Sequence, residues 1–127
     1  MKRQAVVTTA APAAIGPYSQ AIHDGEWIFC SGQLGLDPAS GQMVTGGITD
    51  ETEQAIRNLA SILNAAGSGL DRVVKTTVFL TNLADFQAMN EVYSRYFTAP
   101  APARSTIQVA ALPRGGKVEI EAIALKA

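Results

Sequence analysis

Polar and apolar residues alternate along the last part of the chain, on either side of a short break. In the first run, the polar residues Arg104, Thr106 and Gln108 alternate with Ser105, Ile107 and Val109. In the second run, the glutamates at 119 and 121 alternate with Val118, Ile120 and Ala122. A period of two residues predicts β-strands, separated here by Pro-Arg-Gly-Gly at 113–116. Charges within strands are uncommon. Arg104 and Glu119 therefore either lie on solvated faces with ordinary salt bridges or serve a function.

The same analysis predicts four more strands and two helices. The strands, rich in apolar and β-branched residues, are expected at 4–9, 18–22, 27–31 and 73–80. The first helix follows an irregular loop at 35–48, and its apolar stripe is Ile56, Leu59, Ala60 and Leu63. The second helix spans about 84–97, and its buried side is Phe86, Met89, Tyr93 and Phe97.

The order of these elements, β-β-β-α-β-α-β-β, predicts a single α+β domain over residues 1–127. We expect one mixed sheet of about six strands with two helices packed on one face. A hairpin turn is expected at 23–26, where Asp-Gly accepts positive φ. The third strand, apolar on both faces, should lie inside the sheet and end at Gly32. Thr49 or Asp50 is the expected cap of the first helix, and Gly67 should follow its last turn.

Composition narrows the classes of protein. The net charge of −1 gives no basic field for nucleic acid, and no apolar run is long enough to span a membrane. The single cysteine, Cys30, and the absence of a signal-like N-terminus lead us to expect a cytoplasmic location. One histidine and one cysteine do not form a zinc site, so no metal is expected. A core of this size would benefit from self-association.

Arg104 is the candidate for ligand binding, because a guanidinium matches a carboxylate through two parallel hydrogen bonds. The alternative is a structural salt bridge. A simple hairpin through 113–116 would pair Ala110 with Glu119 and leave Arg104 roughly 20 Å away. If Arg104 and Glu119 share one ligand, another strand lies between their strands or the two groups belong to different subunits.

Four blocks of sequence, in order and covering nearly the whole chain, resemble the RidA (YjgF, reactive-intermediate deaminase) family. They are Ile-Gly-Pro-Tyr-Ser-Gln at 15–20, Ser-Gly-Gln at 31–33, Val-Lys-Thr-Thr-Val-Phe-Leu at 74–80, and Pro-Ala-Arg-Ser at 102–105 followed by Leu-Pro at 112–113 and Glu-Ile-Glu-Ala at 119–122. The resemblance implies a fold like that of the trimeric chorismate mutase. It also implies a homotrimer with clefts at the subunit interfaces.

The resemblance further implies an enzyme that hydrolyses 2-iminobutanoate and 2-iminopropanoate, formed from enamine tautomers, to 2-keto acids and ammonia without a cofactor. Arg104 and the backbone of Gly32 would bind the substrate carboxylate. Glu119 would shuttle protons through a water held by Thr106, at a position where many family members have cysteine. Threonine keeps the hydrogen bonds but not thiol chemistry, so no covalent intermediate is expected.

Three more residues are weaker candidates. Tyr18 would form a wall of the cleft and bond the carboxylate or the water, or it is an aromatic at the core edge. Ser31 is a further substrate-binding candidate. Asn90 is either a polar residue facing water or a buried amide that orders a loop or a ligand.

Two rival functions remain open. One is a ribonuclease or inhibitor of translation, a description given to some family members. The other is a carboxylate-binding or chaperone-like module without turnover. RNA cleavage that depends on Glu119 would favour the first. Ligand binding that depends on Arg104, without release of ammonia, would favour the second.

Overall fold

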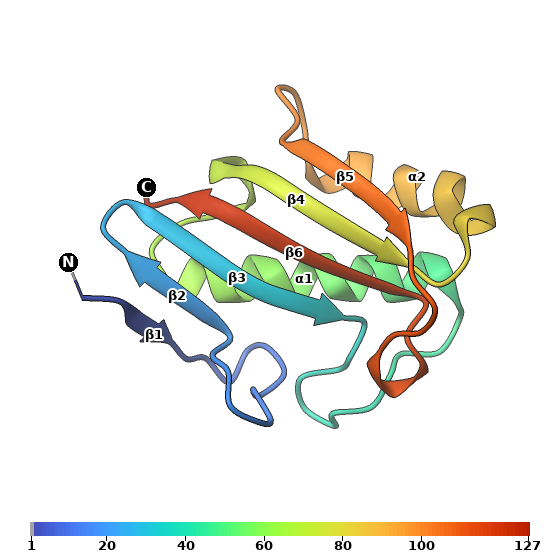
Figure 1. Ribbon diagram of the computed structural model, residues 1–127, viewed down its shortest axis with the longest axis horizontal. Helices are drawn as coiled ribbons and strands as arrows, with labels where there is room; N and C mark the ends of the chain where they lie inside the picture. Colours follow the sequence, from blue (N-terminus) through green and yellow to red (C-terminus); the bar gives the residue numbers. More distant parts are fainter. Residues whose placement is uncertain (1) are drawn as a thin grey trace.

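The computed structural model describes residues 2–127, which form six strands and two helices (Figure 1). The strands are β1 (Gln4–Val6), β2 (Ala21–Asp24), β3 (Trp27–Leu34), β4 (Val73–Leu80), β5 (Ala103–Gln108) and β6 (Val118–Leu125). The helices are α1 (Ile48–Ala65) and α2 (Phe86–Tyr96), and the 3-10 turns are η1 (Leu70–Arg72), η2 (Leu83–Asp85) and η3 (Pro113–Gly115). The predicted order of strands and helices is confirmed.

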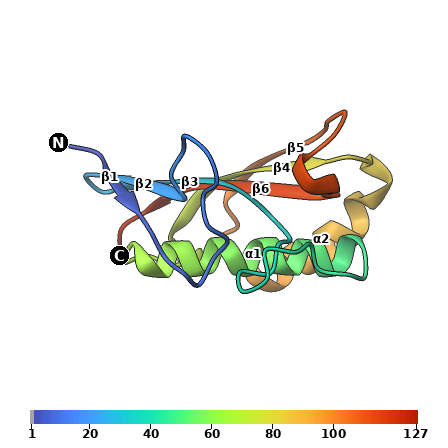
Figure 2. The ribbon, with the colours of Figure 1, turned by 90° about the horizontal axis from the view of Figure 1, so that it is seen from below.

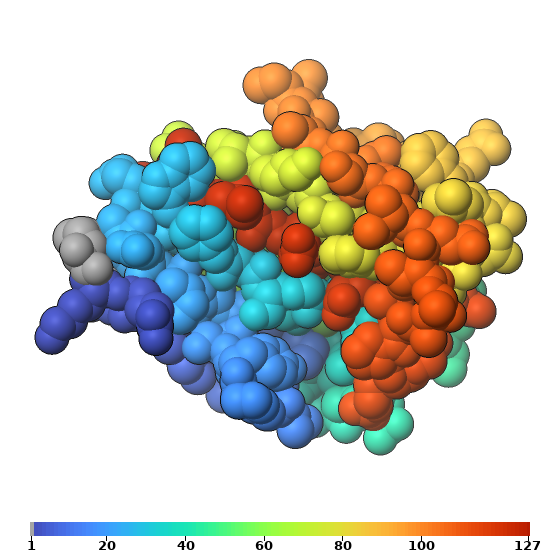
Figure 3. All heavy atoms as spheres, viewed as in Figure 1, coloured from blue at the N-terminus to red at the C-terminus, as the bar shows by residue number. Residues whose placement is uncertain are grey.

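The six strands form one mixed sheet in the order β1-β2-β3-β6-β4-β5. Only the β4–β5 pair is parallel among the described strands; the other pairs are antiparallel. Both helices lie on the same side of this sheet (Figure 2). The opposite side, here called the open face and seen in Figure 3, is covered by neither α1 nor α2. The predicted fold class is therefore confirmed.

The two C-terminal strands do not form the simple hairpin that was considered for them. β5 and β6 do not pair, because β4 lies between them and bonds to both. Glu119 on β6 is opposite Phe79 on β4, which in turn is opposite Ile107 on β5. Of the two arrangements left open by the sequence, the structure shows an intervening strand.

The core lies between the sheet and the helices. Ile56, Leu59 and Leu63 of α1 are fully buried, as the apolar stripe predicts. They pack with the helix-facing residues of β6, Val118, Ile120, Ala122 and Ala124. Burying a side chain the size of leucine contributes about 1.5–3 kcal/mol, so this alternation specifies which face of β6 contacts the helices. Glu119 and Glu121 consequently lie on the open face.

Several predicted boundaries need correction. β2 begins at Ala21, since the side chain of Gln20 bonds the backbone at Thr8 and Pro12 and organises the loop before the strand. β3 runs beyond Gly32 to Leu34 through an irregularity in its pairing with β6. β1 is shorter than expected, and α2 begins at Phe86 after the turn η2. The predicted buried side of α2 is wrong at Phe86, which is 39% exposed, and is confirmed at Met89, Tyr93 and Phe97.

The ends of α1 are partly as predicted. Neither Thr49 nor Asp50 caps it, because the helix already begins at Ile48 and Gly47 occupies the cap without a side-chain bond. At the other end, Gly67 has φ +79° and its N–H donates to the carbonyl of Asn64, as expected for a glycine that ends a helix. Within residues 2–127, no helix has both the length and the apolar character needed to cross a membrane.

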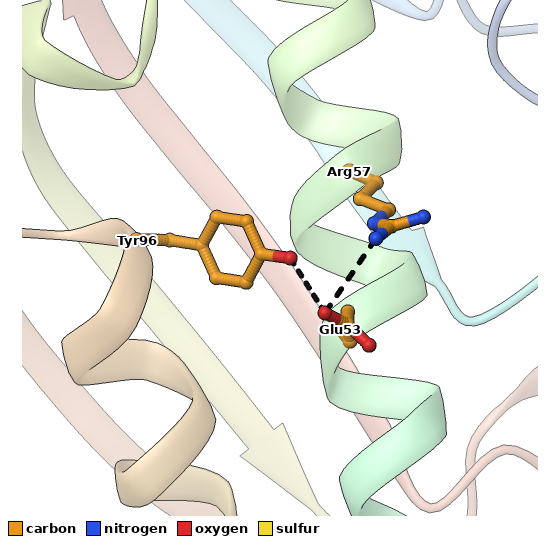
Figure 4. A network of polar contacts seen from close by, with 3 residues as sticks. All are labelled: Glu53, Arg57 and Tyr96. Atoms are coloured by element: carbon orange, nitrogen blue, oxygen red, sulfur yellow. Dashed lines mark hydrogen bonds and ion pairs between the residues drawn. The ribbon is translucent and has the colours of Figure 1, made fainter.

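A polar contact joins the two helices on their outer side (Figure 4). The hydroxyl of Tyr96 on α2 donates to Oε1 of Glu53 on α1 at 2.7 Å. Arg57, one turn further along α1, forms an ion pair with the same oxygen at 3.7 Å and is largely exposed. The tyrosine bond therefore crosses between elements, whereas the ion pair stays within one helix.

We predict that Tyr96→Phe lowers the free energy of unfolding by about 1 kcal/mol, because it deletes a hydrogen bond to a carboxylate that docks α2 on α1. Arg57→Ala should have a smaller effect, because an exposed ion pair is well screened. Urea unfolding of both variants measures this. An equal loss in the two variants would contradict it.

Candidate functional site

The first part of the site is a carboxylate lying over a glycine. Glu119 is on β6, and Gly32 is on the neighbouring strand β3, where the pairing shifts between Cys30 and Gln33. A Cβ atom at Gly32 would lie only 2.7 Å from Cδ of Glu119. Any larger residue would displace the carboxylate, so glycine is needed here for close approach. The resemblance assigns the backbone of Gly32 to substrate binding, and in this chain the side chain of Glu119 lies close to it.

Glu119 and Gly32 line a pocket of about 310 Å³ on the open face. The loop after β1 supplies Ile15 and Tyr18 to its wall, and the turn before β6 supplies Arg114. Tyr18 is 55% exposed, and its hydroxyl accepts a hydrogen bond from the N–H of Ile15 at 3.3 Å. Its aromatic ring is therefore a wall of this pocket and not part of the core.

Arg114 was not expected from the sequence. It is the only non-glycine residue with positive φ in the described chain, at φ +61°, and its Nη2 donates to the carbonyl of Gly41 at 2.9 Å. That bond ties the turn before β6 to the loop at 35–47 beside the pocket. The Pro-Arg-Gly-Gly sequence predicted a break but gave no sign of where this side chain points.

The pKa of Glu119 is raised above its ordinary value. The main cause is burial, which disfavours the charged form, and the second is the negative charge of Glu121 on the same face. A carboxyl group of this kind exchanges protons nearer to neutral pH and suits acid–base chemistry. Glu121 itself is exposed and does not line the pocket.

The second part of the site is on the helix side of β5. The guanidinium carbon of Arg104 lies 4.7 Å from the centre of the Tyr93 ring and 5.6 Å from that of Phe86, both on α2. Within residues 2–127, the structure records no hydrogen bond or ion pair to this guanidinium. Its N–H donors therefore stay available to a ligand, and the salt-bridge alternative is not observed.

Two polar atoms near this cation have no partner. Oγ1 of Thr106, two residues along β5 on the same face as Arg104, and Oδ1 of Asn90 on α2 are buried without a hydrogen bond. Asn90 lies four residues after Phe86 and three before Tyr93, so it is on the helix face beneath Arg104. Buried polar groups are nearly always bonded, and such exceptions indicate a missing water or ligand. The carbonyl of Asn90 is thus buried, not turned to water.

Ser31 and Cys30 lie elsewhere. The hydroxyl of Ser31 donates to the carbonyl of Ser19, so this side chain fixes the loop that carries Tyr18. Cys30 is buried, and burial raises the pKa of its thiol to about 12. A thiol with that pKa stays protonated and is a poor nucleophile. Among residues 2–127, no three His, Cys, Asp or Glu side chains gather in a way that could hold a metal ion.

The two parts of the site are on opposite faces of the sheet. Arg104 pairs with Thr76, which is fully buried toward the helices, and Glu119 pairs with Phe79, three residues further along the same strand. Because side chains alternate between faces, an odd separation places these two residues on opposite sides. Within one chain, Arg104 and Thr106 therefore do not meet Glu119, Gly32 and Tyr18.

Comparison with known proteins identifies close relatives. The family model described as "Endoribonuclease L-PSP" matches residues 8–126. A mouse protein named 2-iminobutanoate/2-iminopropanoate deaminase is 56% identical over 124 residues, covering 98% of this chain and 92% of that protein.

Solved structures agree over the whole chain. A crystal structure from Thermotoga maritima, described as a putative endoribonuclease, is 53% identical with a TM-score of 0.96, and the match covers 100% of this chain and 99% of that one. TdcF of E. coli with bound serine is 40% identical with a TM-score of 0.93, covering 98% and 99%.

We predict that Glu121→Gln lowers the pKa of Glu119, because it removes the like charge that disfavours ionisation. Titration of the Glu119 side-chain carbon signal by NMR measures this. The same substitution at Glu26, in the exposed turn at the far end of β3, is the matched control and should leave that pKa unchanged.

The stability effect of Glu121→Gln has a defined sign. Above the raised pKa of Glu119, both carboxylates are ionised in the folded protein, so removing one charge should stabilise it. Below the ordinary pKa of both groups no charge is removed, and the effect should vanish. An unchanged or higher pKa of Glu119 in this variant would contradict the assigned cause.

Proposed function

The chain belongs to the endoribonuclease L-PSP family, which is the RidA (YjgF) family that its motifs resemble, and we propose that it hydrolyses short 2-imino acids to 2-keto acids and ammonia. The mouse relative, more than half identical over nearly all of this chain, carries the name of that activity. The observation that carries the proposal is the unpartnered guanidinium of Arg104 beside two unpartnered buried polar atoms. The cation and the two polar atoms can together bind the carboxylate and the polar groups of a small acid.

Arg104 binds the substrate's carboxylate in this proposal. A guanidinium offers two parallel N–H donors to a carboxylate and fixes its plane as well as its charge. Asn90 and Thr106 supply the neighbouring hydrogen bonds that the buried site otherwise leaves unmade. The bound serine of the TdcF relative is a small molecule with a carboxylate, which agrees with this class of ligand.

Glu119 transfers protons. Water adds to the carbon of the C=N bond to give a carbinolamine, and collapse of that intermediate leaves a C=O bond and releases ammonia. In the first step Glu119 takes a proton from the attacking water and gives it to the imine nitrogen. In the second step it takes the proton of the carbinolamine hydroxyl and gives it to the departing nitrogen, so both water protons leave in ammonia; its raised pKa suits both steps. Thr106 and the hydroxyl of Tyr18 hold the water. The reaction needs no covalent intermediate, cofactor or metal.

A complete site then requires two copies of the chain. The edge strand β5 of one copy contributes Arg104 and Thr106, and the open face of the next contributes Glu119, Gly32 and Tyr18. We propose a homotrimer, in which three such interfaces close into a ring. The open face supports association, because Trp27, Phe29 and Ile107 are large apolar residues exposed on the single chain.

Ribonuclease activity is the second candidate, favoured by the description of the family model and of the Thermotoga relative. The net charge of −1 offers little attraction for a phosphate backbone. The single histidine, His23, bonds the carbonyl of Gly25 in a turn at the opposite end of the sheet from Glu119. Cleavage of RNA by purified protein that is lost in Glu119→Gln would favour this candidate.

A cytoplasmic location is also proposed and rests on the free thiol of Cys30.

We predict that the wild type accelerates the decay of 2-iminopropanoate generated in situ, and that Arg104→Ala lowers kcat/KM about a hundredfold or more by removing the carboxylate's partner. Arg104→Lys should retain part of the activity, because it keeps the charge and loses the planar fork. Arg95→Ala, an exposed arginine on α2, is the matched control and should behave as wild type. Decay that persists in Arg104→Ala would move the carboxylate site elsewhere.

We expect Glu119→Gln to lower kcat by about 10²–10⁴-fold while binding of the keto acid product persists, because general acid–base catalysis is lost and the carboxylate contact is not. Single-turnover decay and product titration separate the two effects. Loss of product binding with kcat unchanged would contradict the assigned role. No acceleration by folded wild type would contradict the proposed hydrolysis and leave the ribonuclease and binding-module alternatives.

A further inference from the structure

The Arg104 guanidinium is held by aromatic rings instead of by hydrogen bonds. It lies over the face of Tyr93 and beside Phe86, at 4.7 Å and 5.6 Å from the ring centres. Cations on aromatic faces are attracted by the ring's quadrupole, and the attraction grows when the pair is shielded from water. The contact involves no hydrogen bond, so the N–H donors of the guanidinium stay free for a ligand.

The Tyr93 ring is itself fixed. It is 5% exposed, and its hydroxyl bonds Oγ1 of Thr76 at 2.7 Å. Thr76 is directly opposite Arg104 in the β4–β5 register. The hydroxyl partner of Tyr93 is therefore the cross-strand neighbour of Arg104. A second aromatic, Phe97, packs on the other part of Tyr93 with ring centres 4.4 Å apart. Burial raises the pKa of the Tyr93 hydroxyl, so the hydroxyl keeps its proton.

We propose that Tyr93 is a positioning residue for Arg104: its buried ring, packed on Phe97 and assisted by Phe86, holds the guanidinium ready to receive the substrate's carboxylate. An arginine side chain has many rotamers, and ordering it before the ligand arrives removes part of the cost of binding. This inference rests on the proposed function only in taking a carboxylate as the ligand of Arg104.

The test uses 2-oxobutanoate, a keto acid product of the proposed reaction, and measures its dissociation constant by NMR titration of the full-length protein. Tyr93→Leu removes the ring and should weaken binding about tenfold. Tyr93→Phe combined with Thr76→Val keeps the ring and removes both hydroxyls, so no buried hydroxyl loses its partner. That double variant should bind within about threefold of wild type, because the aromatic face remains.

Tyr96→Leu is the matched control. Tyr96 lies on the same helix, but its hydroxyl bonds Glu53 on α1 (Figure 4). The rings that lie over Arg104 are those of Tyr93 and Phe86. The variant loses a ring of the same size, so it reports a general effect on α2. Binding of 2-oxobutanoate should be unchanged within about twofold, since no contact to Arg104 is lost.

A spectroscopic measurement separates positioning from a structural role. In the free wild type, the Cδ protons of Arg104 should resonate upfield, because they experience the ring currents of Tyr93 and Phe86. The shift should persist in the Tyr93→Phe/Thr76→Val variant and in Tyr96→Leu, and be reduced in Tyr93→Leu. Phe86→Leu, at a partly exposed position, should reduce it and weaken binding about threefold, and it serves if Tyr93→Leu does not fold.

Several results would overturn the inference. These are unchanged affinity in folded Tyr93→Leu, equal losses in Tyr96→Leu, an equal loss in the variant that keeps the ring, or ordinary Arg104 proton shifts in the wild type. Failure of the proposed function would look different. The wild type would then neither bind 2-oxobutanoate nor consume 2-iminopropanoate, while the proton shifts would still decide whether Tyr93 holds Arg104.

Discussion

The alternation of side chains along β-strands is the constraint on which the site depends. Thr76 and Phe79 on β4 face opposite sides, and through their pairing they place Arg104 toward the helices and Glu119 on the open face. Glu119 cannot change sides without a register slip that would expose the buried residues of β6, such as Ile120. The sheet therefore separates Arg104 from Glu119 within one chain, and in the proposed mechanism a second copy of the chain reunites them.

The residues around each part of the site determine its geometry and its protonation. On the open face, the absence of a side chain at Gly32 lets Glu119 lie against β3, and partial burial there raises its pKa. On the helix side, α2 supplies the aromatic rings under Arg104 and the unpartnered amide of Asn90. The hydrogen bond from Tyr96 to Glu53 anchors that helix to α1 (Figure 4). The rings of α2 therefore position the binding group, whereas the bond from Tyr96 to Glu53 contributes to the stability of the helix pair.

The sequence predicted elements with strong local patterns well. The strand at 73–80 has the predicted bounds, since its β-branched run allows few alternatives. The stripe on α1 is buried as expected. Pairing was harder, because the contacts of β6 with β3 and β4 join distant segments that no local pattern specifies. The turn at 113–116 suggested a hairpin, and only the register shows β4 inserted between β5 and β6.

For the candidate site, the residue types were predictable and the supporting contacts were not. Arg104 and Glu119 are conspicuous because charges are unusual in strands. Their placement on opposite faces depends on the register of β5 and β6 with β4. No local sequence pattern specifies that register. In the sequence, Tyr93 is an ordinary apolar-face residue of a helix. Its contact with Arg104 is visible only in the structure, because the two residues lie on different elements. The position of Arg114 depends in the same way on a loop seventy residues away.

Mixing two inactive variants tests the shared site most directly. Arg104→Ala and Glu119→Gln chains would be unfolded together, refolded at equal amounts, and assayed for 2-iminopropanoate decay, with mixed oligomers verified by native mass spectrometry. If each site takes Arg104 from one copy and Glu119 from another, about a quarter of the sites should regain both residues in a ring of any size. Activity near a quarter of wild type is the predicted result. No recovery in verified mixed oligomers would contradict a site shared between copies.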